Sequence, residues 1–121
     1  MDHNIIIKKL FDAYKTFYAY SALFPKKDKY TLGAKCELQI ISVLELLLEA
    51  SWSSKEEKIV LLKKASIKFD MLKIFIRLLK DLNILDNKKY LDIQTQLQEI
   101  GRMLGGWQKS LTNKNPENGT L

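Results

Sequence analysis

Helix-breaking residues are sparse in this chain, and their scarcity constrains the fold more than any other feature. Among 121 residues, prolines occur only at positions 25 and 116, and glycines only at 33, 101, 105, 106 and 119. Long segments between them repeat apolar residues three and four positions apart, which is the spacing of amphipathic helices. No period-two alternation is long enough to indicate a strand. The sequence therefore predicts an all-α protein.

Four segments carry this helical spacing, over about 4–22, 30–50, 54–82 and 87–111. Pro25 ends the first helix, because the residue before a proline avoids the α region. Ser53 or Ser54 is expected to cap the third helix, and Asn83 to end it. Short connections favour an up-down antiparallel four-helix bundle over residues 1–111. We expect the polar segment 112–121 to be a disordered tail.

Apolar residues on the second and third predicted helices exceed what a single bundle needs. On the third helix they cover roughly 200°, whereas a bundle helix needs an apolar stripe of only about 100°. We expect another subunit to bury this excess apolar surface; alternatively, the core is thicker and loops bury the excess. Because the connections are too short to roof much surface, we predict a homo-oligomer. On this helix we predict helix-packing or oligomer contacts at Leu72, Phe75 and Leu79.

The chain is basic, with 20 Lys and Arg residues against 14 Asp and Glu residues, a net charge of +6 and a pI near 9.4. Such an excess suits RNA or DNA as a partner, although it can also serve solubility alone. Arg77 and Arg102 are the only arginines. Lysine is a flexible point charge, so this surface favours phosphate contact over base reading.

The first predicted connection, residues 23–32 (LFPKKDKYTL), concentrates basic and aromatic side chains. Its lysines are suited to phosphate contact, and Tyr30 to stacking on an exposed base. The alternative is a solvated loop with Tyr30 tucked against the bundle end. The predicted nucleic-acid-binding residues are Lys26, Lys27, Lys29, Tyr30, Lys73, Arg77 and Arg102.

Three glycines interrupt the last predicted helix within residues 100–107 (IGRMLGGW). Gly101 and Gly105 share one helix face, and each costs about 1 kcal/mol relative to alanine in a helix interior. We predict that this face, with Trp107, allows close approach of another helix; alternatively, the helix bends or ends near Gly106. The segment lacks the preceding strand and the glycine spacing of a nucleotide-binding loop.

Residues suited to catalysis are scarce. His3 is the only histidine, and no Ser-His-Asp set is possible away from the N-terminus. Glu45 and Glu49 lie one helical turn apart and could face a metal, but di-metal bundles need Glu-x-x-His pairs, which are absent. Cys36, the only cysteine, falls in an apolar stripe and is expected to be a buried filler. We predict no enzymatic activity, no catalytic residue, no metal and no cofactor.

No segment has the properties of a membrane span or a signal peptide. No apolar stretch approaches the ~18 residues of a spanning helix. The apolar run near the N-terminus is three residues long and has charges on both sides. We therefore expect a cytoplasmic protein without a membrane partner.

Two segments resemble a known protein family. They are residues 23–27 (LFPKK) followed by 30–33 (YTLG), and residues 100–107 (IGRMLGGW). The order of the helices and residues 70–79 are also similar, so that the resemblance covers about 10–110. The family comprises the accessory variability determinant (Avd) proteins of diversity-generating retroelements and the related proteins encoded by 23S ribosomal RNA intervening sequences.

This resemblance implies a four-helix bundle that assembles into a homopentameric barrel with a basic surface. Avd proteins associate with the reverse transcriptase of the element, bind nucleic acid and support mutagenic copying of template RNA, without a catalytic site of their own. By this resemblance, close helix approach is expected at Gly101 and Gly105, and basic contact at Lys26, Lys27 and Lys29. The other branch remains open: an intervening-sequence protein that acts as a structural or protein-interaction oligomer without a reverse transcriptase partner.

Overall fold

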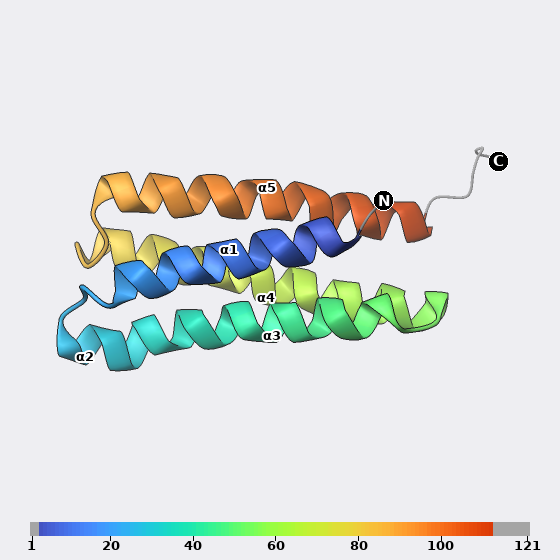
Figure 1. Ribbon diagram of the computed structural model, residues 1–121, viewed down its shortest axis with the longest axis horizontal. Coiled ribbons are helices and arrows are strands. Elements are labelled where there is room, and N and C mark those ends of the chain that lie inside the picture. Colours follow the sequence, from blue (N-terminus) through green and yellow to red (C-terminus); the bar gives the residue numbers. More distant parts are fainter. Residues whose placement is uncertain (1–2, 113–121) are drawn as a thin grey trace.

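The computed structural model of the protein describes residues 3–112, and this part of the chain contains four long helices and no strand (Figure 1). The long helices alternate in direction along one common axis, which confirms the predicted all-α, up-down four-helix bundle. The elements in chain order are α1 (His3–Ser21), α2 (Lys26–Asp28), the π-helix η1 (Lys29–Gly33), α3 (Ala34–Ser51), α4 (Lys55–Asp81) and α5 (Asn87–Thr112).

Each long helix packs on two neighbours. α3 packs on α4, α4 on α5, α5 on α1 and α1 on α3, so that α1 and α4 lie diagonally across the bundle. One amide fixes the level of α3 against α4: Gln39 Nε2 donates to the carbonyl oxygen of Lys68 at 3.3 Å. The two helices run in opposite directions with the same rise per residue. A residue a given number of positions after Gln39 on α3 therefore lies at the height of the residue the same number of positions before Lys68 on α4.

The core follows the predicted helical periodicity. On α4 and α5 the buried positions are three or four residues apart, so each helix presents one apolar stripe inward. Cys36 lies in this core, where burial, together with the nearby charge of Glu37, raises the pKa of its thiol to about 12. The buried side chains of α4 and α5 are Leu62, Ala65, Phe69, Leu72, Ile76, Leu79, Tyr90, Ile93, Leu97, Ile100, Leu104 and Trp107.

Side chains mark both ends of α4 and the start of α5. Ser54 Oγ accepts from the backbone N–H of Glu57 at 3.3 Å, while Glu57 Oε1 accepts from the backbone N–H of Ser54 at 3.1 Å, which together form a capping box. Asn83 adopts a φ of 60°, the left-handed conformation that stops a helix. Asp86 Oδ1 accepts from the backbone N–H of Lys89 at 2.8 Å. The predicted boundaries at Ser54 and Asn83 are thus confirmed.

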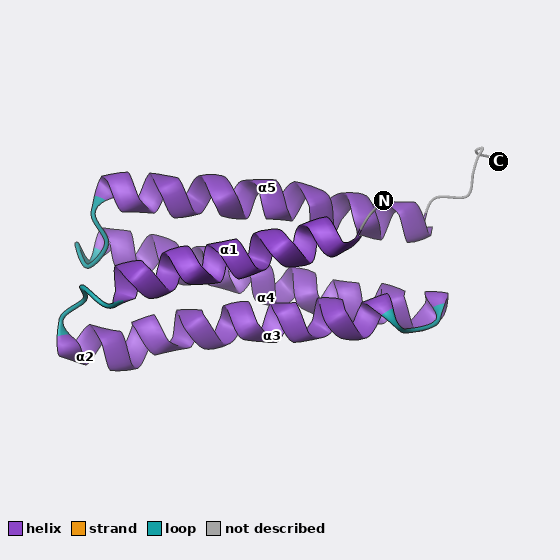
Figure 2. Cartoon of the chain, in the orientation of Figure 1, coloured by secondary structure: helices purple, strands orange, loops and turns teal. Residues whose placement is uncertain are grey.

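The segment 23–32 is not an extended loop, which corrects the prediction. After a short connection, α2 begins directly behind Pro25, whose carbonyl accepts from the backbone N–H groups of Asp28 and Lys29 (Figure 2). Proline ends one helix but is also tolerated where the next begins, since its missing N–H has no partner there. η1 then leads into α3 without a break. A Cβ at Gly33 would lie 3.0 Å from the carbonyl oxygen of Asp28 and 3.2 Å from the Phe24 ring, so a larger residue there would push these neighbours away by a few tenths of an ångström.

α5 continues through its glycines to Thr112, so the alternative of a helix end near Gly106 is wrong. The predicted polar tail begins at Thr112, which is still helical, and its remainder, 113–121, lies outside the described residues. No helix within residues 3–112 combines the length and the apolar character needed to cross a membrane.

Candidate nucleic-acid interface and assembly surface

The predicted nucleic-acid-binding residues fall into two separate groups. Lys26, Lys27, Lys29 and Tyr30 lie on α2 and η1 at one end of the bundle, and we call them the lysine turn (Figure 1). The other group lies along the α4–α5 side: Lys73 and Arg77 are on α4, and Arg102 is on α5. The structure therefore does not join all seven residues into one patch.

The cations of the lysine turn have no ion-pair partner within residues 3–112. Lys26 and Lys27 are exposed, and Lys29 Nζ lies 5.9 Å from the centroid of the Tyr30 ring, within range of a cation–π contact. Asp28 is the one carboxylate within the turn itself. Three positive charges are thus presented within one helical turn, where phosphates can approach.

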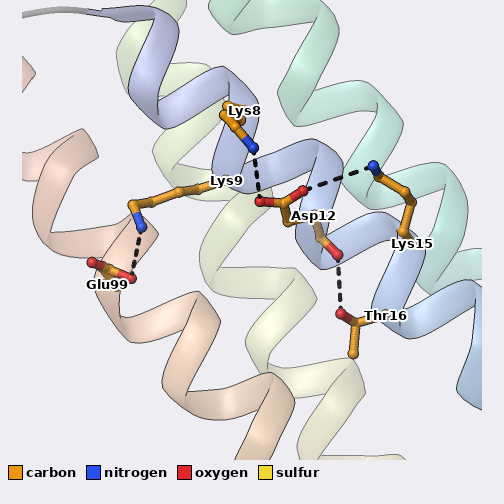
Figure 3. Close-up of polar contacts among 6 residues, drawn as sticks. All are labelled: Lys8, Lys9, Asp12, Lys15, Thr16 and Glu99. Carbon is orange, nitrogen blue, oxygen red and sulfur yellow. Dashed lines mark hydrogen bonds and ion pairs between the residues drawn. The ribbon is translucent and has the colours of Figure 1, made fainter.

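The lysines of α1 are placed differently (Figure 3). Lys8 Nζ and Lys15 Nζ lie 3.6 and 3.9 Å from the carboxylate oxygens of Asp12, and Lys9 Nζ lies 3.2 Å from Glu99 Oε1 on α5. Such exposed pairs contribute little to stability, but each carboxylate cancels positive charge locally. The face that α1 and α5 share is therefore a weaker candidate for phosphate contact than the lysine turn.

Carboxylates also accompany two of the three cations in the second group. Lys73 Nζ lies 3.5 Å from Asp70 Oδ1, and Arg77 Nε donates to Asp81 Oδ1 at 3.1 Å. This hydrogen bond and the charge of Asp81 raise the pKa of the Arg77 guanidinium. Lys73 and Arg102 line one groove of about 480 Å³ between α4 and α5. The charge of this group is therefore largely balanced, except at Arg102.

Gly101 and Gly105 form part of the floor of the same groove. A Cβ at Gly101 would meet the Phe69 ring at 3.4 Å, an ordinary van der Waals contact, and a Cβ at Gly105 would meet nothing within 4 Å. No helix of the same molecule comes close to Gly105, so the predicted close approach is wrong at that position for packing within one molecule. At Gly101, the ring of Phe69 on α4 is in contact range. The space above Gly105 is open to an outside partner.

Three of the predicted oligomer contacts are buried inside a single molecule. Leu72, Leu79 and Trp107 are at most 1% exposed and pack in the bundle core, while Phe75 is half-buried. These three residues therefore make helix-packing contacts inside one molecule, as one of the two predicted roles required, and the other role, contact with another copy, is wrong for them. The apolar sector of roughly 200° predicted for this helix included both inward and outward positions, because periodicity alone does not show on which side the core lies.

The surplus apolar surface is nevertheless present, on the face of α4 that points away from the core. Six exposed side chains, which we call the α4 stripe, lie within about a quarter of the helix circumference. Ile74, in the middle, is 65% exposed. The sequence signal was a second apolar repeat out of phase with the buried one, and the prediction missed its members at 60, 67 and 74. The α4 stripe consists of Val60, Ile67, Met71, Ile74, Leu78 and Leu82.

No metal-binding cluster supports an enzymatic reading. Within residues 3–112, no group of three or more His, Cys, Asp or Glu side chains is placed to hold a metal ion. Glu45 and Glu49, the pair considered from sequence, are exposed on α3. They are therefore two surface carboxylates without a third ligand in the described part of the chain.

A family model described as bAvd-like matches residues 4–111. The chain belongs to the bAvd-like family. No curated protein matches the chain. The family match spans all four long helices and confirms the Avd resemblance found in residues 23–33 and 100–107. The Avd-like family is a non-catalytic accessory family.

Proposed function

We propose that this bAvd-like protein is a non-catalytic, oligomeric accessory protein of a diversity-generating retroelement. In the cytoplasm, it binds the reverse transcriptase of the element together with template RNA or its cDNA, and so supports mutagenic retrohoming. The observation that carries this proposal is the lysine turn, three cations without carboxylate partners in the described chain, at one end of a bAvd-like bundle.

Assembly accounts for the α4 stripe. Six exposed apolar side chains follow one another along residues 60–82, about 33 Å of helix, and a row of this kind marks a candidate protein–protein contact surface. We propose that it packs against a neighbouring copy in a closed ring of five, the count that the family resemblance implies. A ring needs two different faces on each copy, and α3 supplies a second exposed apolar face with Leu38, Leu48 and Trp52.

Charge supports pairing of these two faces. In a ring whose rotation axis is parallel to the helices, equivalent residues of neighbouring copies lie at the same height along that axis. The Gln39–Lys68 hydrogen bond then sets Glu45 on α3 at the level of residue 62 on α4. Carboxylates on the outer face of α3 (Glu45 and Glu49) therefore lie near the level of exposed lysines on α4 (Lys63 and Lys64). Opposite charges at one height favour this register between neighbours.

Binding of labelled single-stranded RNA and DNA, followed by fluorescence anisotropy over a salt series, tests the nucleic-acid part. Each lost phosphate contact lowers the slope of log affinity against log salt by about 0.7 for single strands. Replacing Lys26, Lys27 and Lys29 by alanine is thus expected to weaken binding and to lower the slope by about 2. Replacing Lys8, Lys9 and Lys15, whose charges face carboxylates, is the matched control. Wild-type protein that binds neither strand near 50 mM salt would refute this part.

A second candidate is the intervening-sequence branch, a structural or protein-interaction oligomer without a polymerase partner. The carboxylates beside the lysines of α1 and beside Lys73 and Arg77 favour it, because they reduce the charge available to a polyanion. It predicts an assembly that binds no nucleic acid. The salt series therefore separates the two candidates.

A further inference from the structure

A small hollow lies between the end of α1 and η1. Its volume is about 210 Å³, below the 300 Å³ at which sites for drug-sized ligands begin, so it suits a ligand no larger than a single nucleobase. Two tyrosines, a lysine and a carboxylate share it with small side chains. Its lining residues are Tyr18, Ser21, Ala22, Lys29, Tyr30, Ala34 and Glu37.

The two tyrosines offer exposed aromatic rings. Tyr18 on α1 is 62% exposed, and Tyr30 on η1 is 66% exposed. The Tyr14 ring stacks against the Tyr18 ring with centroids 6.3 Å apart, and this contact supports the Tyr18 ring in its position. Lys29 Nζ lies 5.9 Å from the Tyr30 centroid. Exposed aromatic side chains beside cations are the means by which proteins bind unpaired bases.

Glu37 gives the hollow its polarity. Its Oε1 accepts from the hydroxyl of Tyr14 at 3.2 Å, and its Oε2 lies 3.1 Å from Ser21 Oγ, whose single proton is shared with the carbonyl oxygen of Tyr18, also at 3.1 Å. Both hydroxyl groups belong to α1 and hold the carboxylate in place. An ionised carboxylate only accepts and has about four acceptor positions, so each oxygen keeps capacity for one more donor.

Two free acceptors side by side select a ligand with two adjacent donors. Among the four RNA bases, guanine has this arrangement on its Watson–Crick edge, where N1–H and the N2 amino group are neighbours. Adenine and cytosine each pair one amino donor with a ring nitrogen acceptor, and uracil flanks its single N–H with two carbonyls. The carboxylate therefore matches guanine and mismatches the other three.

The turn that carries Tyr30 is itself unusual. η1 is a π-helix, a widened turn that is rare in proteins and frequent at functional sites. A Cβ at Gly33 would lie 3.0 Å from the carbonyl oxygen of Asp28, so the backbone is tightly packed here. Lys29 lies on this turn, and Lys26 and Lys27 lie on α2 directly before it, so phosphates on either side of a bound base would lie near these lysines.

We propose that this hollow binds one unpaired guanine of a single-stranded nucleic acid, with the base against Tyr18 and Tyr30 and its Watson–Crick edge on the Glu37 carboxylate. The inference deepens the proposed function, because it rests on nucleic-acid binding by the lysine turn. It adds a base preference that lysines alone do not give.

The test compares fluorescein-labelled oligouridine with the same oligomer carrying one central guanine, adenine or cytosine, as RNA and as DNA. Anisotropy is expected to show about tenfold tighter binding for the guanine oligomer alone. Glu37→Gln replaces one acceptor by a donor and is expected to abolish this preference, measured as the ratio of guanine-oligomer to oligouridine affinity. The ratio cancels the general gain in affinity expected when a negative charge is removed beside Lys29. Glu45→Gln, on the same helix outside the hollow, is the control and keeps the preference.

Tyr30→Ala provides a second variant, which does not touch the hydrogen bonds of Glu37. It is expected to lose most of the guanine preference, whereas Trp52→Ala, an exposed aromatic at the other end of α3, keeps it. Circular dichroism confirms that each variant is folded.

The outcomes separate the base site from the proposed function. If all oligomers bind equally, or if folded Glu37→Gln keeps the preference, the guanine site is overturned and nucleic-acid binding stands. If no oligonucleotide binds, the proposed nucleic-acid function is wrong, and so is a guanine site for single-stranded nucleic acid. Titration with guanosine monophosphate then addresses the hollow alone: saturable binding lost in Glu37→Gln supports guanine recognition with a free nucleotide as source, and no binding overturns it.

Discussion

Replacement of Ile74 by aspartate is a sharp test of the assembly surface. Ile74 lies in the middle of the α4 stripe and is 65% exposed in a single molecule. Full burial of such a side chain contributes about 1.5–3 kcal/mol, so a neighbouring copy that covers the exposed two thirds gains about 1–2 kcal/mol per interface. Aspartate forfeits this gain and adds the penalty of an unpaired carboxylate at the interface. Because the site is exposed in the monomer, folding stability should change by only about 0.5 kcal/mol.

Size-exclusion chromatography with light scattering reads the result. Wild-type protein is expected at about five times the 14.1 kDa chain mass, and Ile74→Asp at or near the mass of one chain. Urea unfolding of the variant should show a folded protein. Leu91→Asp, a 50% exposed leucine on α5 outside the stripe, is the matched control and should retain the assembly. A wild-type monomer at micromolar concentration, or an Ile74→Asp variant with the full assembled mass, would refute the reasoning.

Three further predictions concern the bundle itself. Gly105→Ala is expected to raise the free energy of unfolding of an Ile74→Asp monomer by about 1 kcal/mol, because its Cβ meets no atom within 4 Å; a loss in urea unfolding would contradict the open space. Ser54→Ala removes half of the capping box and should lower the free energy of unfolding by about 1 kcal/mol, and an unchanged urea midpoint would count against the cap. The backbone N–H of Lys89 lowers the pKa of Asp86, so its ionised carboxylate stabilises the fold above the ordinary pKa of an aspartate, and this contribution is lost as the pH falls through the lowered value. Asp86→Ala should therefore lower the thermal midpoint at pH 7, with a difference that disappears in acid; a difference independent of pH would exclude this origin.

Local sequence signals were enough to predict the helices. The buried stripe of α4 repeats every three or four residues, and Ser54 and Asn83 mark its ends through contacts within a few residues of the chain. The bundle topology followed from the short connections. Because these features depend on residues close together in the chain, a single amino-acid sequence was sufficient to predict them.

Features that depend on tertiary contacts were not predictable in the same way. The rotation of α4 within the bundle decides that Leu72 is core and Ile74 is surface, although both fit an apolar helix. The close packing of Gly33 against Phe24 and Asp28 is a contact visible only once the turn is folded. The role of Glu37 depends on Tyr14, 23 residues away on another helix.

Reconstituted cDNA synthesis tests the central claim most directly. A diversity-generating retroelement reverse transcriptase from the same genome would be supplied with its template RNA, with and without this protein. We predict that template-derived cDNA requires the protein, that it falls with Ile74→Asp and with alanine at Lys26, Lys27 and Lys29, and that protein and enzyme elute together from a sizing column. Equal cDNA yield and fidelity without the protein, together with separate elution, would contradict its role as an accessory of the polymerase.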